Sequence, residues 1–180
     1  MIMISKQMII IVILILISIV DGSRYNYNCH QYENRVYQLT VTFPDKEPLY
    51  CALRLQTHGM FDELFSIAGG NNAAELGSSF ALSNRVGYYK CLAGNKMHLT
   101  GLGYLYKTED VEFLKENGAV VIHDYSFRFH NDGKKLTGQV KFAVFKNGEN
   151  PFTTNDKPVF VGDIGQVKGE LLKYREYYKL

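Results

Sequence analysis

Short runs in which apolar and polar residues alternate recur along most of this chain, and turn-forming residues separate them. The runs begin roughly 8 to 15 residues apart. Strict alternation places every second side chain on one face of an extended strand, which suits a sheet that buries one face. The chain also holds 13 Tyr and 11 Phe, and aromatic side chains favour strands. This rhythm predicts an all-β antiparallel domain.

The alternating runs predict eight strands. In chain order these are residues 36–43, 49–57, 60–68, 85–92, 96–107, 119–130, 136–145 and 159–172. The third run also shows helical spacing, but its shortness and its hairpin-like neighbours favour a strand. Residues 69–79 are expected to form an irregular loop, and residues 108–118 a short helix that ends at Gly118. Asn131-Asp132-Gly133 is the strongest hairpin signal in the chain.

These strands predict an eight-stranded antiparallel up-and-down barrel with at most one or two short helical turns. No crossover helix separates successive strands, which excludes a parallel α/β fold. A closed barrel leaves no exposed sheet edge. A two-sheet sandwich is the alternative.

The first residues predict export rather than a part of the barrel. Lys6 is the only charge before an apolar run over residues 8–20, and about 13 apolar residues suit a signal peptide better than the roughly 20 of a membrane-spanning helix. We expect cleavage before Ser23 and a secreted protein with no membrane span after cleavage; an uncleaved anchor is the alternative. The predicted divisions are a signal peptide (1–22), a polar leader (23–35), the barrel domain (36–172) and a polar tail (173–180).

Charge and motifs exclude several functional classes. Twenty Lys and Arg against 18 Asp and Glu give a net charge of +2, which argues against a basic nucleic-acid-binding surface. The five histidines and three cysteines show no spacing typical of a metal site. The chain also lacks a nucleophile elbow and a phosphate-binding loop. We therefore assign no catalytic residue, no metal and no cofactor from the sequence, and the oligomeric state stays open.

Three cysteines in an oxidising compartment allow one disulfide and leave one thiol. If the second, third and fourth strands are neighbours, Cys51 and Cys91 lie two strand spacings apart, about 9.5 Å. This exceeds the roughly 7 Å Cα limit for a disulfide. Cys29 and Cys91 fall at one end of the predicted barrel and Cys51 at the other. We predict a Cys29–Cys91 disulfide that pins the leader beneath the barrel, and a buried, free Cys51.

The inward face of the barrel is the candidate binding site. It combines aromatic rings, two glycines that we expect to leave open volume, and a few polar groups. The predicted ligand-binding residues are Phe61, Phe65, Gly101, Gly103, His123, Tyr125 and Phe127. His123 is either a buried, hydrogen-bonded core residue or a polar anchor or acid/base in the lumen. Glu63 points inward if residues 60–67 form a strand, and is solvated if they form a helix.

The order of motifs resembles a known group of barrels. The similarity covers roughly residues 36–172 and rests on this order: a glycine after the second strand, a Gly-Tyr-Tyr strand, Leu-Thr-Gly-Leu-Gly-Tyr, a long strand, the Asn-Asp-Gly hairpin, Leu-Thr-Gly-Gln-Val and, near the end, Val-Lys-Gly-Glu-Leu-Leu. This pattern resembles small calycin-type barrels, and among them the allene-oxide-cyclase-like barrels that include secreted dirigent-type proteins. The resemblance rests on strand rhythm and glycines, so it implies a barrel but no active-site residues. The chain has no Trp and therefore lacks the lipocalin Gly-x-Trp signature.

Three functional hypotheses follow for such a barrel. The first is a secreted module that binds a small apolar ligand in its lumen. The second is an isomerase or cyclase that uses the same lumen, and the third is an extracellular interaction protein whose barrel is packed solid. Two or more inward ionisable residues with raised pKa favour the enzyme, whereas apolar rings with one polar anchor favour the carrier.

Overall fold

The computed structural model describes residues 29–66, 71–73, 78–109, 111–153 and 156–173. The predicted signal peptide, its cleavage site, residues 23–28 of the leader and residues 174–180 of the tail lie outside these residues. The strands are β1 (Arg35–Thr42), β2 (Leu49–Leu55), β3 (Met60–Phe65), β4 (Asn71–Ala73), β5 (Ser78–Phe80), β6 (Arg85–Leu92), β7 (Lys96–Leu105), β8 (Ala119–His130), β9 (Lys135–Lys146), β10 (Phe160–Val161) and β11 (Gly165–Leu171). Single 3-10 turns form η1 (Cys29–Tyr32), η2 (Thr57–Gly59) and η4 (Glu112–Leu114).

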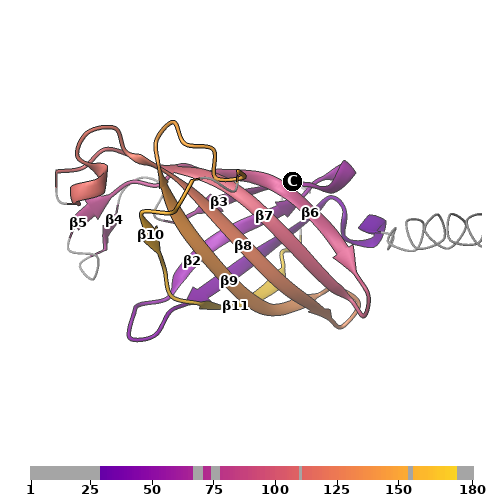
Figure 1. The fold of residues 1–180 in the computed structure, drawn as a ribbon. Helices are drawn as coiled ribbons and strands as arrows, with labels where there is room; N and C mark the ends of the chain where they lie inside the picture. The colour runs from indigo at the N-terminus through magenta and orange to yellow at the C-terminus, as the bar shows by residue number, and fades with distance from the viewer. Residues whose placement is uncertain (1–28, 67–70, 74–77, 110, 154–155, 174–180) are drawn as a thin grey trace, which may run out of the picture.

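Eight of these strands close into one antiparallel barrel, in the order β1-β2-β3-β6-β7-β8-β9-β11 (Figure 1). Closure comes from β11, which pairs with β9 on one side and with β1 on the other. The predicted fold class is confirmed, and the sandwich alternative is wrong. All eight barrel ladders are antiparallel, so every strand finds a partner on both sides.

The alternation of the sequence sets which side chains fill the barrel. In β8, Tyr125, Phe127 and Phe129 are buried, whereas the residues between them are exposed. The same period of two buries Leu53 and Leu55 of β2. The strand interpretation of residues 60–65 is therefore confirmed and the helical one is wrong, because β3 buries Phe61 and Glu63 with the same period.

The last predicted strand, 159–172, is not continuous. Val161 of β10 lies opposite Ala143, whereas Gly165 of β11 lies opposite Val140 on the same partner strand. Four steps along the chain thus face three steps of β9, so one extra residue interrupts the ladder. Such a bulge bends a strand, and here it separates β10 from the barrel strand β11.

Two connecting segments also differ from the predictions. The irregular loop expected over residues 69–79 contains β4 and β5, which pair as a small antiparallel ribbon. The helix expected over residues 108–118 is reduced to the single turn η4. Gly118 nevertheless ends this segment as predicted, with a φ of +68° that L side chains rarely adopt.

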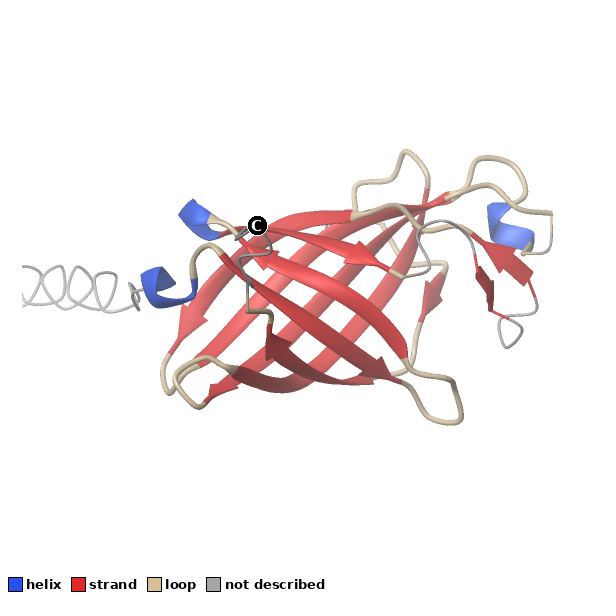
Figure 2. Cartoon of the chain, turned by 180° about the vertical axis from the view of Figure 1, so that it is seen from behind, coloured by secondary structure: helices blue, strands red, loops and turns tan. Residues whose placement is uncertain are grey.

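The two ends of the barrel are built differently (Figure 2). We call one the hairpin end, because tight turns join its strands: residues 56–59, 93–95 and 131–134. We call the other the loop end, because it carries the longer connections: residues 43–48, 66–84, 106–118 and 147–164. A rigid scaffold with long connections at one end is the usual arrangement for a binding site.

The hairpin end is closed by the leader. Cys29 and Cys91 form a disulfide with a Cα–Cα distance of 5.7 Å, and Cys51 is free and buried, so both cysteine predictions are confirmed. Tyr32 of η1 stacks on Phe129, with ring centroids 4.0 Å apart. The leader therefore packs against the core at this end.

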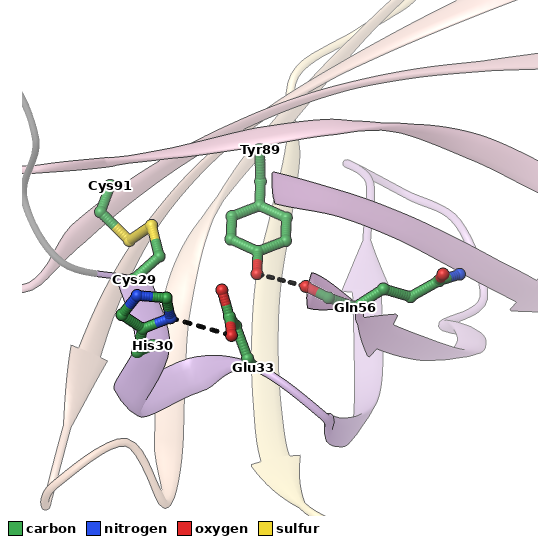
Figure 3. The surroundings of a disulfide bond; sticks show 6 residues. All are labelled: Cys29, His30, Glu33, Gln56, Tyr89 and Cys91. Carbon is green, nitrogen blue, oxygen red and sulfur yellow. Dashed lines mark hydrogen bonds and ion pairs between the residues drawn. A yellow bond between two sulfur atoms is a disulfide. The ribbon is translucent and has the colours of Figure 1, made fainter. Parts of the chain in front are cut away.

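Beside the disulfide, Tyr89 ties β6 to the turn that follows β2 (Figure 3). Its hydroxyl donates a hydrogen bond of 2.6 Å to the backbone carbonyl of Gln56. Burial, together with the charge of Glu33, raises the pKa of Tyr89 to about 12. The phenol therefore stays protonated and keeps donating across the physiological range of pH.

Candidate functional site

Three polar side chains from three strands meet inside the barrel toward its loop end. Glu63 of β3 lies opposite Arg85 of β6 in the ladder, and neither is exposed to solvent. Arg85 Nε lies 3.3 Å from Glu63 Oε2. Tyr125 reaches the same point from β8, across the barrel. The three side chains form what we call the buried polar cluster.

The Tyr125 hydroxyl connects the two charges of this cluster. It donates to the Glu63 carboxylate, at 2.9 Å from Oε2 and 3.0 Å from Oε1. It accepts a hydrogen bond of 2.9 Å from Arg85 Nη1. One carboxylate and one guanidinium give the buried polar cluster no net charge, which is the condition under which buried ions are tolerated.

The surroundings of the cluster shift the pKa values of its groups so that Arg85 and Tyr125 stay protonated. Burial lowers the pKa of Arg85, but the charge of Glu63, together with Tyr125 and Cys51, more than offsets this, so the pKa lies above its usual value. Burial raises the pKa of the Tyr125 phenol well above 10. Burial and the neighbouring Glu63 likewise raise the pKa of the Cys51 thiol. Cys51 is therefore an unreactive thiol rather than a nucleophile.

His123 adds a fourth polar side chain beside the cluster. It is the inward residue that precedes Tyr125 on β8, and its ring stacks between Tyr125, at 6.3 Å, and Phe142 of β9, at 5.6 Å. It keeps only 8% of its surface exposed. Burial and the charge of Arg85 lower its pKa well below 6.5. His123 is therefore a neutral imidazole at neutral pH.

Two nitrogen atoms in this region lack partners. Arg85 Nη2 and His123 Nδ1 are buried without a hydrogen bond to any residue that the structure describes. Arg85 Nε also lacks hydrogen-bond geometry, although it keeps its ion-pair contact with Glu63. A buried polar group without a partner costs about 1–3 kcal/mol. Such groups are rare in folded proteins, and each one calls for a water, an ion or a ligand as partner.

Half-buried aromatic rings separate the cluster from solvent. The Arg85 guanidinium lies over the ring of Phe65, 4.1 Å from its centroid, and His123 lies against Phe142. Phe65 and Phe142 are both partly exposed. Phe142 also contacts the ring of Phe160, with centroids 6.0 Å apart. The side chains that carry the unpartnered nitrogens therefore pack against rings that are themselves partly exposed.

The space expected above the two glycines is filled, so that part of the prediction is wrong. A Cβ added to Gly101 would lie 2.7 Å from Cζ of Phe61. A Cβ added to Gly103 would lie 2.7 Å from Cγ of Arg85. The glycines instead make room for these two side chains, because the ring and the guanidinium stem pack directly on their backbone.

The structure brings together only part of the predicted site. Phe65, His123 and Tyr125 surround the unpartnered nitrogens, and Gly103 supports Arg85. Phe61 belongs to the packed core. Phe127 also belongs to it, although its ring contacts that of Tyr125, with centroids 5.2 Å apart.

Sequence reasoning missed Arg85. A charged residue at the start of a strand is normally assigned to the outer surface. The available signal was Glu63, whose inward position in a strand requires a cation nearby.

The described residues contain no group of three or more His, Cys, Asp or Glu side chains arranged to hold a metal ion. Within the same residues, no helix is both long enough and apolar enough to span a membrane. The molecule is thus a closed eight-stranded antiparallel barrel, an architecture consistent with calycin-type barrels, with a charge-balanced polar cluster inside it. Comparisons with protein-family models, curated proteins and solved structures found no match to the chain.

Proposed function

We propose that this chain is a secreted barrel protein that binds a small, largely apolar molecule at the loop end of its lumen. The main observation behind this proposal is that two buried nitrogens, Arg85 Nη2 and His123 Nδ1, have no hydrogen-bond partner among the described residues. Binding pockets are mostly apolar and hold a few convergent polar groups, often at the mouth of a barrel. Phe65 and Phe142 supply the apolar surface beside those nitrogens.

Two further observations support the proposed setting and class. A disulfide at the hairpin end fits an oxidising compartment, and residues 8–20 have the composition of a signal peptide. We also propose kinship with the allene-oxide-cyclase-like and dirigent-type barrels, on the order of their glycine motifs. N-terminal sequencing of the exported protein should begin within two residues of Ser23; recovery of Met1 in a membrane fraction contradicts this part of the proposal.

The binding proposal is tested with diphenylhexatriene, an uncharged fluorescent hydrocarbon that gains intensity in apolar sites. We expect saturable uptake by the wild-type protein. Phe142→Trp adds bulk beside His123 and should weaken uptake at least tenfold. Tyr88→Trp is the control, because it also replaces a ring on a barrel strand with tryptophan but does so on the outer face, where Tyr88 is 69% exposed.

Absence of uptake by a protein that melts cooperatively would favour the solid-packed barrel. If the two tryptophan variants lose probe uptake equally, the probe binds somewhere other than the loop end of the lumen. Native mass spectrometry of the purified protein supplements the titration, because it reports a retained natural ligand and the number of subunits together.

A second candidate is an isomerase or cyclase that uses the same residues. Its support is that Tyr125 and Cys51 are both inward, ionisable and raised in pKa, although the raised pKa leaves the Cys51 thiol unreactive. Tyr125 is also the better placed of the two, because its hydroxyl lies between Glu63 and Arg85. As a protonated phenol it would serve as a proton donor. If the wild-type protein converts the retained ligand, Tyr125→Phe should abolish the conversion while changing the affinity for the ligand by no more than about fivefold. A ligand that is recovered unchanged after incubation with the wild-type protein contradicts the enzyme candidate.

A further inference from the structure

We infer that the molecule bound at the loop end is uncharged and carries an oxygen atom, as a ketone or an alcohol on an apolar body does, and that this oxygen accepts a hydrogen bond from Arg85 Nη2. The inference rests on the proposed binding function and deepens it. It is drawn from the charge balance of the buried polar cluster and from the two nitrogens that the cluster leaves unpartnered.

The first step concerns charge. The Arg85 guanidinium is already neutralised by Glu63, with which it forms an ion pair inside the barrel. Both side chains are at most 1% exposed. A carboxylate or phosphate entering this site would place a second negative charge beside a single cation. Burial of an unbalanced charge is strongly unfavourable, so the cluster discriminates against anions.

The second step concerns hydrogen bonds. A guanidinium nitrogen can only donate, so the unpartnered Arg85 Nη2 requires an oxygen or nitrogen acceptor. His123 Nδ1 donates in one tautomer and accepts in the other. A ketone oxygen can accept from both nitrogens, and a hydroxyl can accept from Arg85 while it donates to His123. A hydrocarbon satisfies neither.

The third step concerns position. Arg85 and His123 both contact Tyr125, the former through its hydroxyl and the latter through its ring. The two side chains that carry the unpartnered nitrogens therefore adjoin one region of the lumen, around Tyr125. The rings of Phe65 and Phe142 border it. This combination fits a molecule whose oxygen points to the cluster and whose apolar part lies against the aromatic rings.

The test compares three nine-carbon competitors that differ only in the head group: nonan-2-one, nonane and nonanoate. Each is titrated against bound diphenylhexatriene at pH 8. A hydrogen bond to a charged group is worth about tenfold or more in affinity, so nonan-2-one should displace the probe at least tenfold better than nonane. Nonanoate should also compete at least tenfold less well than the ketone.

Two variants test whether the preference for the ketone comes from the groups at the loop end. His123→Phe keeps a ring against Phe142 but removes Nδ1, and it should weaken nonan-2-one by roughly fivefold while leaving nonane unchanged. The paired variant Glu63→Leu/Arg85→Met removes both charges together, and it should abolish the preference for the ketone over nonane. Thermal melts of both variants establish that they are folded.

The outcomes separate the two proposals. If the wild-type protein takes up no diphenylhexatriene, the binding function itself fails. If the probe binds but nonanoate or nonane competes as well as nonan-2-one, binding stands and the inference about the ligand is wrong. A preference for the ketone that survives in both variants also overturns the inference, since the oxygen would then be held elsewhere.

Discussion

Replacement of Arg85 by Met should destabilise the barrel more than any substitution of an exposed charge. The change keeps most of the aliphatic stem that packs on Gly103 but leaves the Glu63 carboxylate buried without its cation. Breaking a buried ion pair in this way costs about 3–5 kcal/mol. For a domain of this size, each kcal/mol lowers the melting temperature by roughly 2–4 °C. We therefore expect a fall of roughly 6–20 °C in Arg85→Met.

The same reasoning predicts recovery when the whole cluster becomes apolar. Glu63→Leu/Arg85→Met removes both charges but leaves the Tyr125 hydroxyl without either partner. The triple variant that adds Tyr125→Phe removes that hydroxyl as well. Its free energy of unfolding should return to within about 1–2 kcal/mol of the wild type, because well-packed apolar replacements of buried ion pairs are often neutral.

Urea unfolding followed by circular dichroism measures these free energies. The matched control is Arg54→Met, which breaks the ion pair with Asp62 on the outer face, where Arg54 is 58% exposed. Exposed pairs contribute about 0–1 kcal/mol. A loss below 1 kcal/mol in Arg85→Met, or a triple variant less stable than that single one, would refute the account of the cluster.

Three further predictions follow from the packing, the disulfide and the histidine. Gly101→Leu should destabilise the domain by about 1–3 kcal/mol in thermal melts, because the new side chain meets the ring of Phe61; an unchanged melt would mean that the ring moves aside freely. Reduction of the Cys29–Cys91 disulfide should lower the free energy of unfolding by about 2–5 kcal/mol, as measured in urea with and without reductant. His123 has a lowered pKa when folded, so the unfolded chain binds the extra proton more readily, and stability should fall as the pH drops below about 6.5. In urea unfolding at several pH values, His123→Phe should remove up to about 1.4 kcal/mol per pH unit from that slope, and an unaltered slope argues against a buried neutral imidazole.

Much of the barrel could be predicted from local patterns. Strand alternation, the Asn-Asp-Gly turn and the spacing of turn residues act over a few residues, and each can be recognised in the sequence. The Cys29–Cys91 disulfide could be predicted because strand parity places those two cysteines at one end of any up-and-down barrel of this order. These predictions required only which strands are neighbours, not how side chains fill the interior.

The contents of the lumen could not be predicted in the same way. Two glycines on β7 suggested free volume, but whether that volume stays open depends on Phe61 and Arg85 from other strands. The bulge between β10 and β11 depends likewise on the register with β9. A one-residue insertion in a ladder leaves no mark in the composition of the strand that carries it.

The buried ion pair also explains how β6 selects its inward face. Its alternation is ambiguous, because Val86 and Tyr88 are apolar yet 58% and 69% exposed, while Arg85 on the opposite face is buried. A slip of one residue against β3 would exchange the two faces. It would bury the two apolar side chains, but it would also bury Lys90, expose Arg85, leave the Glu63 carboxylate unpaired inside the barrel and turn Cys91 away from its disulfide partner. The charge pair and the disulfide therefore specify a register that hydrophobicity alone does not, and they do so at opposite ends of the same strand.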